Sequence, residues 1–330
     1  MKKTLQYLFE YKTLSRKMAA EVLVNISKGL YNESEMAAFI TVFLMRSITI
    51  DELQGFRDAL LELCVRVDLN GHEVMDIVGT GGDGKNTFNI STLACFIVAG
   101  TGQKVAKHGN YGASSISGAS NVMEMLGYRF KNDPGQLKKE AEIANICFLH
   151  APLFHPALKA VGAIRRNLGI RTFFNMLGPM VNPAFPVFQL VGVYNLEMAR
   201  IYNYLLQQTG GSFTIIHGLD GYDEISLTND TKVINNQGER IMTPEQLGKR
   251  SVEAKDIYGG NTVEEAARIF TQILQGEGTW AQNAVVLANA AMALHCTGNF
   301  ESYDHSYEAA VRSLEGGMAR DALKKLIQLQ

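Results

Sequence analysis

The chain of 330 residues carries 31 Lys and Arg against 33 Asp and Glu, which gives a formal charge of −2 at pH 7. Proteins that bind nucleic acid or anionic membranes through charge alone carry a marked excess of Lys and Arg, so we expect neither partner. Apolar residues make up 46% and charged residues 19% of the chain, which is typical of a globular protein with room for two domains. Ten of the 31 glycines fall within residues 79–127, which indicates a local need for bare backbone.

The four cysteines lie far apart in apolar surroundings and form no Cys-x-x-Cys pair. This usage predicts reduced thiols in a cytoplasmic protein. No uncharged apolar stretch reaches the roughly 18 residues that a membrane span requires. Glu10 and Lys12 interrupt the only stretch that begins as a signal peptide does, so we expect a soluble chain with no membrane partner.

Residues 1–67 are expected to form only helices. Three helix starts can be recognised from their capping residues, namely Ser15, Asn32 with Glu35, and Thr49 with Glu52. The last of these helices carries an apolar stripe at spacings of three and four, formed by Leu53, Phe56, Leu60, Leu63 and Val67. The segment 36–45 is nearly all apolar, and it therefore needs a partner surface on the same chain or on another copy.

From Val74 onward, short apolar runs that end in glycine alternate with segments long enough for helices. The runs predicted as strands are 75–78, 104–106, 146–149, 188–193 and 213–216. Such alternation predicts a mainly parallel sheet covered by helices, in which ligands bind beyond the carboxyl ends of the strands. His155-Pro156 is expected to open a helix that runs through Leu168 and ends at Gly169, near the junction of the two domains.

The first predicted strand is followed by a glycine-rich loop from Gly79 to Lys85. The loop fits G-x-G-x-x-G, but no acidic residue follows about 20 positions later to hold a ribose. It also resembles a P-loop, but Asn86 stands where a Ser or Thr should ligate magnesium. We reject both interpretations. Because a predicted helix start with capping side chains and unpaired amides follows at 89–92, we interpret the loop as an anion site.

A second loop of this kind follows the next predicted strand. Lys107 supplies a positive charge at the strand end, and Asn110, Ser114 and Ser115 supply neutral donors ahead of another helix. Two such loops on neighbouring strands predict a substrate that is phosphorylated at both ends. For His108 the sequence alone favours a structural role over general-base catalysis, because no neighbouring residue would tune its pKa.

The strand predicted at 213–216 ends in a turn that contains Asp223 and Glu224. An acidic turn is ordinarily solvated surface, but carboxylates that share an edge with phosphate loops can ligate Mg²⁺. The histidines and cysteines show no zinc-binding spacing. Arg165, late in the predicted helix at 155–168, is a candidate to bind a carboxylate of a small ligand, although helical arginines are usually solvated.

Taken together, these residues resemble the anthranilate phosphoribosyltransferase family. The segments that carry the resemblance are 79–84, 88–92, 107–110 with 114–115, 165–172, 174–179 with 182–183, and 223–224. The resemblance extends over the whole chain in order and spacing. It implies an α/β fold with a small all-helical domain and a larger α/β domain, whose central, mainly parallel sheet is covered by helices. It also implies a hinge and a homodimer formed through the helical domains.

The domains implied are residues 1–70 for the helical domain, joined by the helix within 153–173, and residues 71–152 with 174–330 for the phosphoribosyl-pyrophosphate-binding domain. The implied reaction transfers phosphoribose from phosphoribosyl pyrophosphate to the amine of anthranilate, in tryptophan biosynthesis. It would proceed by a magnesium-assisted, oxocarbenium-like displacement with no clear acid or base residue. Orientation of the two substrates would supply much of the catalysis.

The resemblance also implies site residues. Those expected to bind phosphoribosyl pyrophosphate are Gly79, Gly82, Asp83, Thr87, Asn89, Ile90, Ser91, Thr92, Lys107, His108, Gly109, Asn110, Ser114, Ser115 and Ala119. Those expected at anthranilate are Gly79, Asn110 and Arg165, and those expected at magnesium are Ser91, Asp223 and Glu224. The chain departs from the commonest family pattern at Tyr111, Ala119 and Asn121, where Arg, Ser and Asp are frequent.

Two other interpretations compete with this one. A pyrimidine nucleoside phosphorylase would share the fold, but its phosphate loop and the segment around Arg165 would differ. A non-catalytic relative that binds nucleic acid would need a strongly basic surface, and it would have no use for Asp223 and Glu224. The near-neutral charge of the chain argues against the second alternative.

Overall fold

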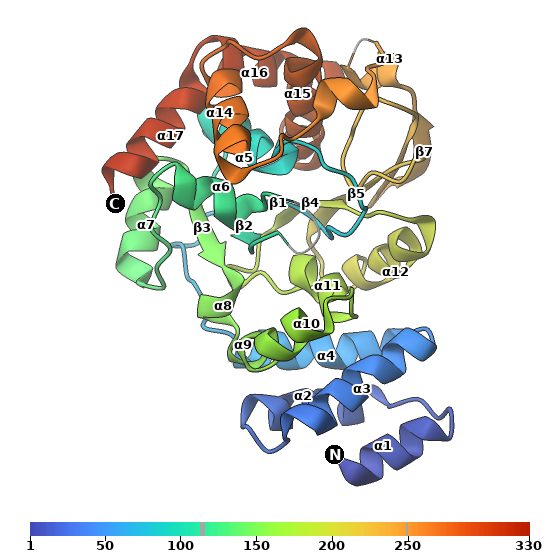
Figure 1. Cartoon of the computed structure of the whole chain (residues 1–330). Coiled ribbons are helices and arrows are strands. Elements are labelled where there is room, and N and C mark those ends of the chain that lie inside the picture. Colours follow the sequence, from blue (N-terminus) through green and yellow to red (C-terminus); the bar gives the residue numbers. More distant parts are fainter. Residues whose placement is uncertain (113–115, 249) are drawn as a thin grey trace. The chain divides into compact units, whose positions relative to one another are not determined.

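The computed structural model describes residues 1–112, 116–248 and 250–330 (Figure 1). The chain divides into two compact units. One, the helical unit, contains Met1–Val67 and Ala151–Pro183, and the other, the α/β unit, contains Asp68–His150 and Ala184–Gln330. None of the described helices is both long and apolar enough to cross a membrane.

The first segment of the helical unit forms four helices. They are α1 (Lys2–Phe9), α2 (Arg16–Ser27), α3 (Glu33–Met45) and α4 (Ile50–Leu63). The Ser15 cap and both capping boxes are present as predicted. The apolar stripe was expected to continue along the helix to Val67, which is wrong, because Cys64 is extended and ends α4. Val67 is buried outside the helix, and its N–H donates to the carbonyl of Pro183.

Aromatic side chains form the core of the helical unit. Phe39 and Phe43 of α3 and Phe56 of α4 surround Phe173, with ring centres 4.7–6.3 Å apart. Phe173 comes from the second segment of the unit, so residues 151–183 complete the core that residues 1–67 begin. This packing explains why α3 is so apolar.

The second segment contains only short helices. They are α8 (Ala151–Phe154), α9 (Pro156–Ala160), α10 (Gly162–Leu168), α11 (Phe174–Leu177) and the 3₁₀ helix η1 (Gly178–Met180). The single helix predicted from His155 to Leu168 is therefore wrong, because the chain breaks at Val161, just before Gly162. Glycine is a weak helix former, which favours a break there. Gly169 ends α10 with φ +62°, as predicted.

A seven-stranded sheet forms the centre of the described α/β unit. Its strands are β1 (Met75–Gly79), β2 (Val105–Gly109), β3 (Ile146–His150), β4 (Phe188–Gly192), β5 (Ser212–Gly218), β6 (Thr231–Asn235) and β7 (Gly238–Met242). Their spatial order is β3-β2-β1-β4-β5-β6-β7. The five strands predicted from sequence are parallel to one another, whereas β6 and β7 add an antiparallel edge that was not predicted.

Helices cover this sheet (Figure 1). They are α5 (Ile90–Gly100), α6 (Ala119–Met125), α7 (Pro134–Ile143), α12 (Leu196–Leu206), α13 (Pro244–Gly248), α14 (Val263–Leu274), α15 (Trp280–Cys296), α16 (Tyr303–Glu315), α17 (Met318–Gln328) and the 3₁₀ helix η2 (Ala254–Ile257). The helices α5, α15, α16 and α17 pack together, and α5 and α15 are buried along almost their whole length. The main core lies between these helices and the sheet.

Candidate active site at the carboxyl ends of the strands

The order of the strands reverses direction at β1. The chain runs from β1 outward through β2 to β3, and then returns to place β4 on the other side of β1. Gly79 ends β1 and pairs in register with Gly192, which ends β4. In open parallel sheets, ligands bind at the carboxyl ends of the strands where the order reverses. The glycine-rich loop begins at this point.

Asp223 lies against both of these glycines. A Cβ atom at Gly79 would stand 2.4 Å from Oδ2 of Asp223, and one at Gly192 would stand 1.6 Å from its carbonyl oxygen. Real Cβ atoms do not approach other atoms so closely, so a larger residue at Gly192 would displace the backbone of Asp223, and one at Gly79 would displace its carboxyl group. The sequence predicted that Gly79 binds phosphate, and it gave no role to Gly192. In the structure, Gly79 and Gly192 both leave room for Asp223.

Hydrogen bonds join the acidic turn to the glycine-rich loop and to the residues that follow the loop. The N–H of Gly81 donates to Oδ2 of Asp223 at 2.7 Å. Glu224 accepts from the hydroxyl of Thr87 at 3.2 Å and from the N–H of Ser91 at 3.0 Å. The structure therefore brings Ser91, Asp223 and Glu224 together, the three residues that the family resemblance implies at magnesium.

The surroundings of Asp83, Asp223 and Glu224 raise the pKa values of their carboxyl groups. Burial, together with the charge of Asp83, raises the pKa of Asp223 to about 7. Burial, together with the charges of Asp223 and Asp83, raises the pKa of Glu224 to about 8. Burial also raises the pKa of Asp83. Among the described residues, no Lys or Arg forms an ion pair with Asp223 or Glu224.

The carboxyl groups of Asp223 and Glu224 fit a cation that binds together with a phosphorylated ligand. No group of three or more His, Cys, Asp or Glu side chains is placed to hold a metal alone within the described parts of the chain. Mg²⁺ at phosphate sites commonly takes one or two protein carboxylates and completes its coordination with phosphate oxygens and water. Asp223 and Glu224 meet that requirement, and a bound cation would favour their ionised forms.

The remainder of the glycine-rich loop is fixed by residues that the sequence did not single out. Asn86 donates from Nδ2 to the carbonyl of Gly260 at 2.8 Å, and its own carbonyl accepts from the N–H of Gly259 at 2.8 Å. A Cβ atom at Gly259 would stand 2.4 Å from the carbonyl oxygen of Thr87. The adjacent glycines at 259–260 were the only sequence signal for this support.

Two charged residues of the glycine-rich loop, Asp83 and Lys85, also make contacts near the acidic turn. Asp83 accepts from the N–H of Lys85 at 3.0 Å. The ammonium group of Lys85 lies 4.5 Å from the ring centre of Tyr222, the residue before Asp223. Gly82 has φ +78°, a conformation that glycine adopts without strain.

The start of α5 differs from the prediction. The side chain of Asn89 does not cap the helix, because its Nδ2 donates instead to the carbonyl of Ser117 at 2.9 Å. The N–H of Ser91, expected to face an anion, donates to Glu224. The side chains of Ile90 and Thr92 are buried. Ligand contacts predicted for these last two residues would therefore have to come from the backbone.

The sequence predicted Lys107 in the loop after the second strand, which is wrong, because Lys107 lies within β2. β2 continues through Gly109, so Lys107 and His108 are strand residues, and both are buried. Lys107 donates from Nζ to the carbonyl of Ile77 at 2.6 Å and approaches the hydroxyl of Ser91 at 3.5 Å. The length of β2 was underestimated, because the charged and polar residues at its carboxyl end do not continue the apolar run.

The second loop begins at Asn110. Oδ1 of Asn110 accepts from the N–H of Tyr111 at 2.8 Å, which leaves Nδ2 as its donor towards a ligand. Tyr111 donates its hydroxyl to Glu124 of α6 at 2.8 Å, and its ring lies edge-on to His150. Ala119 is the first residue of α6. Predicted contacts at Ser114 and Ser115 lie outside the described residues.

Asn121 closes this second loop. Its Oδ1 accepts from the N–H groups of both Gly112 and Gly118, each at 3.0 Å. A Cβ atom at Gly118 would stand 2.2 Å from the backbone nitrogen of Gly112. Both contacts require only an acceptor oxygen. The carboxamide of Asn121 therefore accepts the same two hydrogen bonds that the carboxylate of an Asp could accept at this position.

Arg165 belongs to α10 of the helical unit. Its Nη2 donates to Oδ1 of Asn175 at 3.3 Å, and its guanidinium carbon lies 5.5 Å from the ring centre of Phe174. Burial lowers its pKa from the ordinary value. Among the described residues no acidic side chain pairs with this guanidinium, which leaves its fork of donors able to bind a carboxylate.

Known proteins resemble this chain along its whole length. Residues 71–320 match the model of the glycosyl transferase family a/b domain, and residues 2–64 match that of the helical bundle domain of the same family. The anthranilate phosphoribosyltransferase of Flavobacterium johnsoniae is 59% identical over 100% of this chain and 99% of its own, and one from Bacteroides fragilis is 54% identical with the same coverage.

Solved structures agree with these matches. Anthranilate phosphoribosyltransferase from Thermus thermophilus superposes with a TM-score of 0.90 at 30% identity and covers 98% of each chain. The enzyme from Saccharomyces cerevisiae in complex with PRPP and Mg superposes with a TM-score of 0.89 at 27% identity, covering 98% of this chain and 96% of its own. The predicted family is confirmed: the chain belongs to the anthranilate phosphoribosyltransferases.

Proposed function

We propose that this protein transfers the phosphoribosyl group from phosphoribosyl pyrophosphate to the amine of anthranilate, releasing N-(5-phosphoribosyl)anthranilate and pyrophosphate in tryptophan biosynthesis. The observation that carries the proposal is the pair of carboxyl groups of Asp223 and Glu224, which accept hydrogen bonds from the glycine-rich loop and from the residues that follow it. Full-length similarity to enzymes named for this activity supports it.

The chain's own residues would act by binding and orientation. Ser91, Asp223 and Glu224 would hold the Mg²⁺, whose chemistry is to neutralise charge that develops on the departing pyrophosphate oxygens. The loops that follow β1 and β2 would hold the donor through backbone amides and through the Nδ2 donor of Asn110. The aromatic amine of anthranilate is neutral at pH 7, so its attack on the sugar needs no strong general base.

The acceptor requires recognition of its carboxylate. We propose that Arg165 supplies it, since a guanidinium binds a carboxylate through two parallel hydrogen bonds. The aromatic side chains of Phe173 and Phe174 lie next to each other in the same unit, with ring centres 4.3 Å apart. Gly79 and Asn110 remain our other predicted anthranilate contacts.

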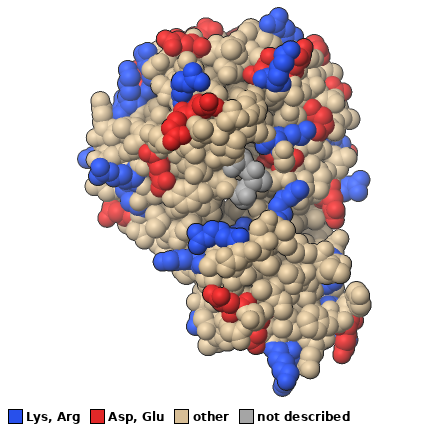
Figure 2. All heavy atoms as spheres, viewed as in Figure 1, with Lys and Arg blue, Asp and Glu red and all other residues tan. Residues whose placement is uncertain are grey.

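The charges that face the viewer in Figure 2 do not favour a polyanionic partner. Lys and Arg are interspersed with Asp and Glu over that face of the described residues, without a continuous basic stripe. A nucleic-acid-binding relative would place basic side chains together along one surface. A small phosphorylated substrate needs only the local donors of the two loops.

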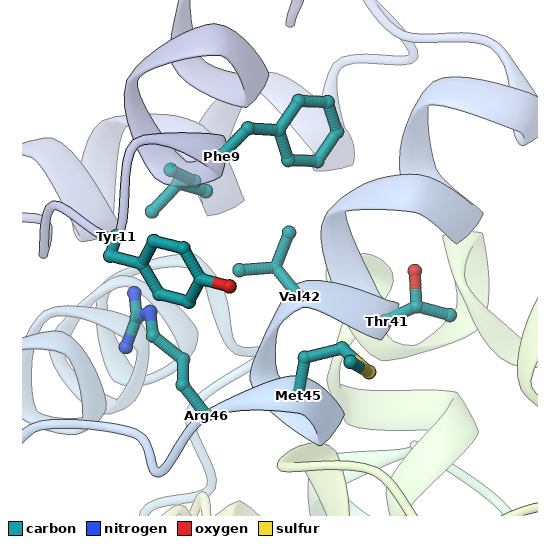
Figure 3. Close-up of a pocket in the computed structure, with 7 residues that line it drawn as sticks. Phe9, Tyr11, Thr41, Val42, Met45 and Arg46 are labelled. Carbon is teal, nitrogen blue, oxygen red and sulfur yellow. The ribbon is translucent and has the colours of Figure 1, made fainter.

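We also propose a homodimer formed through the helical unit. α1 and α3 enclose a pocket of about 220 Å³ whose lining includes Phe9, Val42 and Met45 (Figure 3). Phe9 is 61% exposed and Met45 86% exposed. Two large exposed apolar side chains beside an apolar pocket are a surface that a second copy of the chain would cover. The free state of all four cysteines accords with the proposed cytoplasmic location.

One assay tests the proposed activity. Purified protein is mixed with anthranilate, phosphoribosyl pyrophosphate and Mg²⁺, and the loss of anthranilate fluorescence is followed over time. We expect a loss that requires both the donor and the metal, and that stops when the metal is chelated. Unchanged fluorescence with all three components present would contradict the proposal.

A further inference from the structure

Asn289 is a buried amide in the middle of α15. The helix is apolar around it, with Ala288 and Ala290 fully buried on either side, and Asn289 itself is 2% exposed. A buried amide without hydrogen bonds is costly, so its partners show what it is there to do.

Two of its three hydrogen bonds go to a single residue. Oδ1 of Asn289 accepts from the N–H of Ile225 at 3.1 Å, and its Nδ2 donates to the carbonyl of Ile225 at 2.8 Å. The third bond goes from Nδ2 to the carbonyl of Val285, one turn earlier in the same helix, at 2.9 Å. The side chain thus satisfies both backbone groups of Ile225, as a neighbouring strand would do.

Ile225 follows Glu224 directly in the chain, so this pair of bonds fixes the backbone immediately after the two carboxylates. On the preceding side, the carbonyl of Asp223 is packed against Gly192. The turn is therefore held at both ends by groups that have no charge. A role confined to α15 would be met by the bond to Val285 alone, and it would leave the two bonds to Ile225 without a purpose.

We propose that Asn289 is a positioning residue for the carboxylate pair, which holds Asp223 and Glu224 where they can receive a magnesium ion bound to pyrophosphate. The inference rests on the proposed function. Residues that orient metal ligands without touching the metal typically change metal affinity about 10- to 100-fold when they are replaced.

The test compares two variants that each remove buried side-chain hydrogen bonds within the α/β unit, three at Asn289 and one at Ser313. Asn289→Leu removes the bonds to Ile225 and to Val285 and keeps a side chain with the same number of heavy atoms and the same branching. Ser313→Ala, the control, removes a bond of 2.7 Å from the hydroxyl of Ser313 to the carbonyl of Ile97. For wild type and both variants, calorimetry measures binding of phosphoribosyl pyrophosphate across a series of Mg²⁺ concentrations, and thermal melting measures stability.

Both variants should melt below the wild type. Only Asn289→Leu should need about ten-fold more Mg²⁺ for half-maximal binding of the donor. If the Leu variant does not fold, Asn289→Ser, which replaces the carboxamide by a smaller hydroxyl group, takes its place with the same expected direction. Equal Mg²⁺ midpoints in the wild type and in the folded Asn289 variant overturn the inference. Absence of Mg²⁺-dependent donor binding in the wild type would instead overturn the proposed function.

Discussion

Asp223 and Glu224 have carboxyl groups whose folded-state pKa values lie far above those of the unfolded chain. Between about pH 4 and pH 8 the folded protein therefore retains protons that the unfolded chain has lost. Stability contributed by these protonated groups is complete below the unfolded pKa values, and it is lost as the pH rises through the folded ones. The metal-free protein should thus be weakened by this pair as the pH rises from about 4 to about 8.

The pH dependence can be isolated with the double variant Asp223→Asn, Glu224→Gln, whose amides cannot ionise. Urea denaturation of both proteins with chelator present should show that, between pH 5 and pH 8.5, the wild type loses stability relative to the variant. The relative loss should be at least about 1.4 kcal/mol, the free energy of one pKa unit. Parallel stability curves for the two proteins would show that neither carboxyl titrates in this range.

Arg165 allows a second test at the scale of one residue. Arg165→Ala removes the guanidinium proposed to bind the anthranilate carboxylate, and should raise the KM for anthranilate at least about ten-fold, since charged hydrogen bonds contribute about 1.5–3 kcal/mol. Arg166→Ala is the matched control, because Arg166 is its exposed neighbour on α10. Steady-state kinetics with varied anthranilate distinguish the two. An equal KM for both variants would remove Arg165 from the acceptor site.

Individual elements differ in how well the sequence predicts them. Helix starts at Ser15, Asn32 and Thr49 were predictable because a cap depends on residues three positions apart. β7 was missed because four of its five residues are exposed and it carries no apolar run. Lys107 was misplaced for a related reason, since only the strand pairing of β2 with β3 shows that a buried lysine continues the strand.

The site was partly predictable for the same physical reason. Each motif, such as the glycine-rich loop or the acidic turn, is a local pattern with a recognisable chemistry. The hydrogen bonds that join Gly81 to Asp223, and Ser91 to Glu224, connect residues more than a hundred positions apart, and no local pattern encodes them. The roles of Gly192 and Asn289 could not be predicted, because they depend on contacts with Asp223 and Ile225, which are distant in the sequence.

The paired ends of β1 and β4 yield a prediction at the scale of elements. Gly192→Ala places a methyl group where the carbonyl of Asp223 lies, and the turn must move. We expect a loss of about 2–3 kcal/mol in the free energy of unfolding, the upper range for overpacking in a core. Gly162→Ala, with nothing within 4 Å of the added atom, should not lower stability, because alanine is the better helix former. Urea denaturation of both variants measures this, and equal stabilities would mean that the turn yields freely.

On the scale of the whole molecule, neither unit is continuous in sequence. The chain passes from the helical unit to the α/β unit after Val67, returns after His150, and leaves again after Pro183. Phe173, which completes the aromatic core of the first four helices, lies more than a hundred residues beyond them. The helical unit consequently depends on both of its segments for its core.

The proposed dimer gives a prediction for the assembly. Met45→Glu places a charge on the apolar face formed by α1 and α3, and burying that charge in an interface would be costly. Sedimentation should show the wild type at twice the chain mass of 36.3 kDa and the variant at the mass of one chain. Met18→Glu, on α2 and away from the pocket, is the control and should leave the mass unchanged. A wild type that sediments as a single chain would contradict the dimer.

The long separation between the glycine-rich loop and the acidic turn also bears on the order of folding. The bonds from Gly81, Thr87 and Ser91 to the acidic turn span 133 to 142 residues. The strand β4, which pairs with β1, lies between the two partners in the sequence. Contacts so distant in sequence form slowly, because a large loop must close first. During synthesis, a chain that has emerged only as far as β3 already contains the loops that follow β1 and β2, but not Asp223 and Glu224. Competence to bind the metal should therefore be acquired late, after the centre of the sheet is complete.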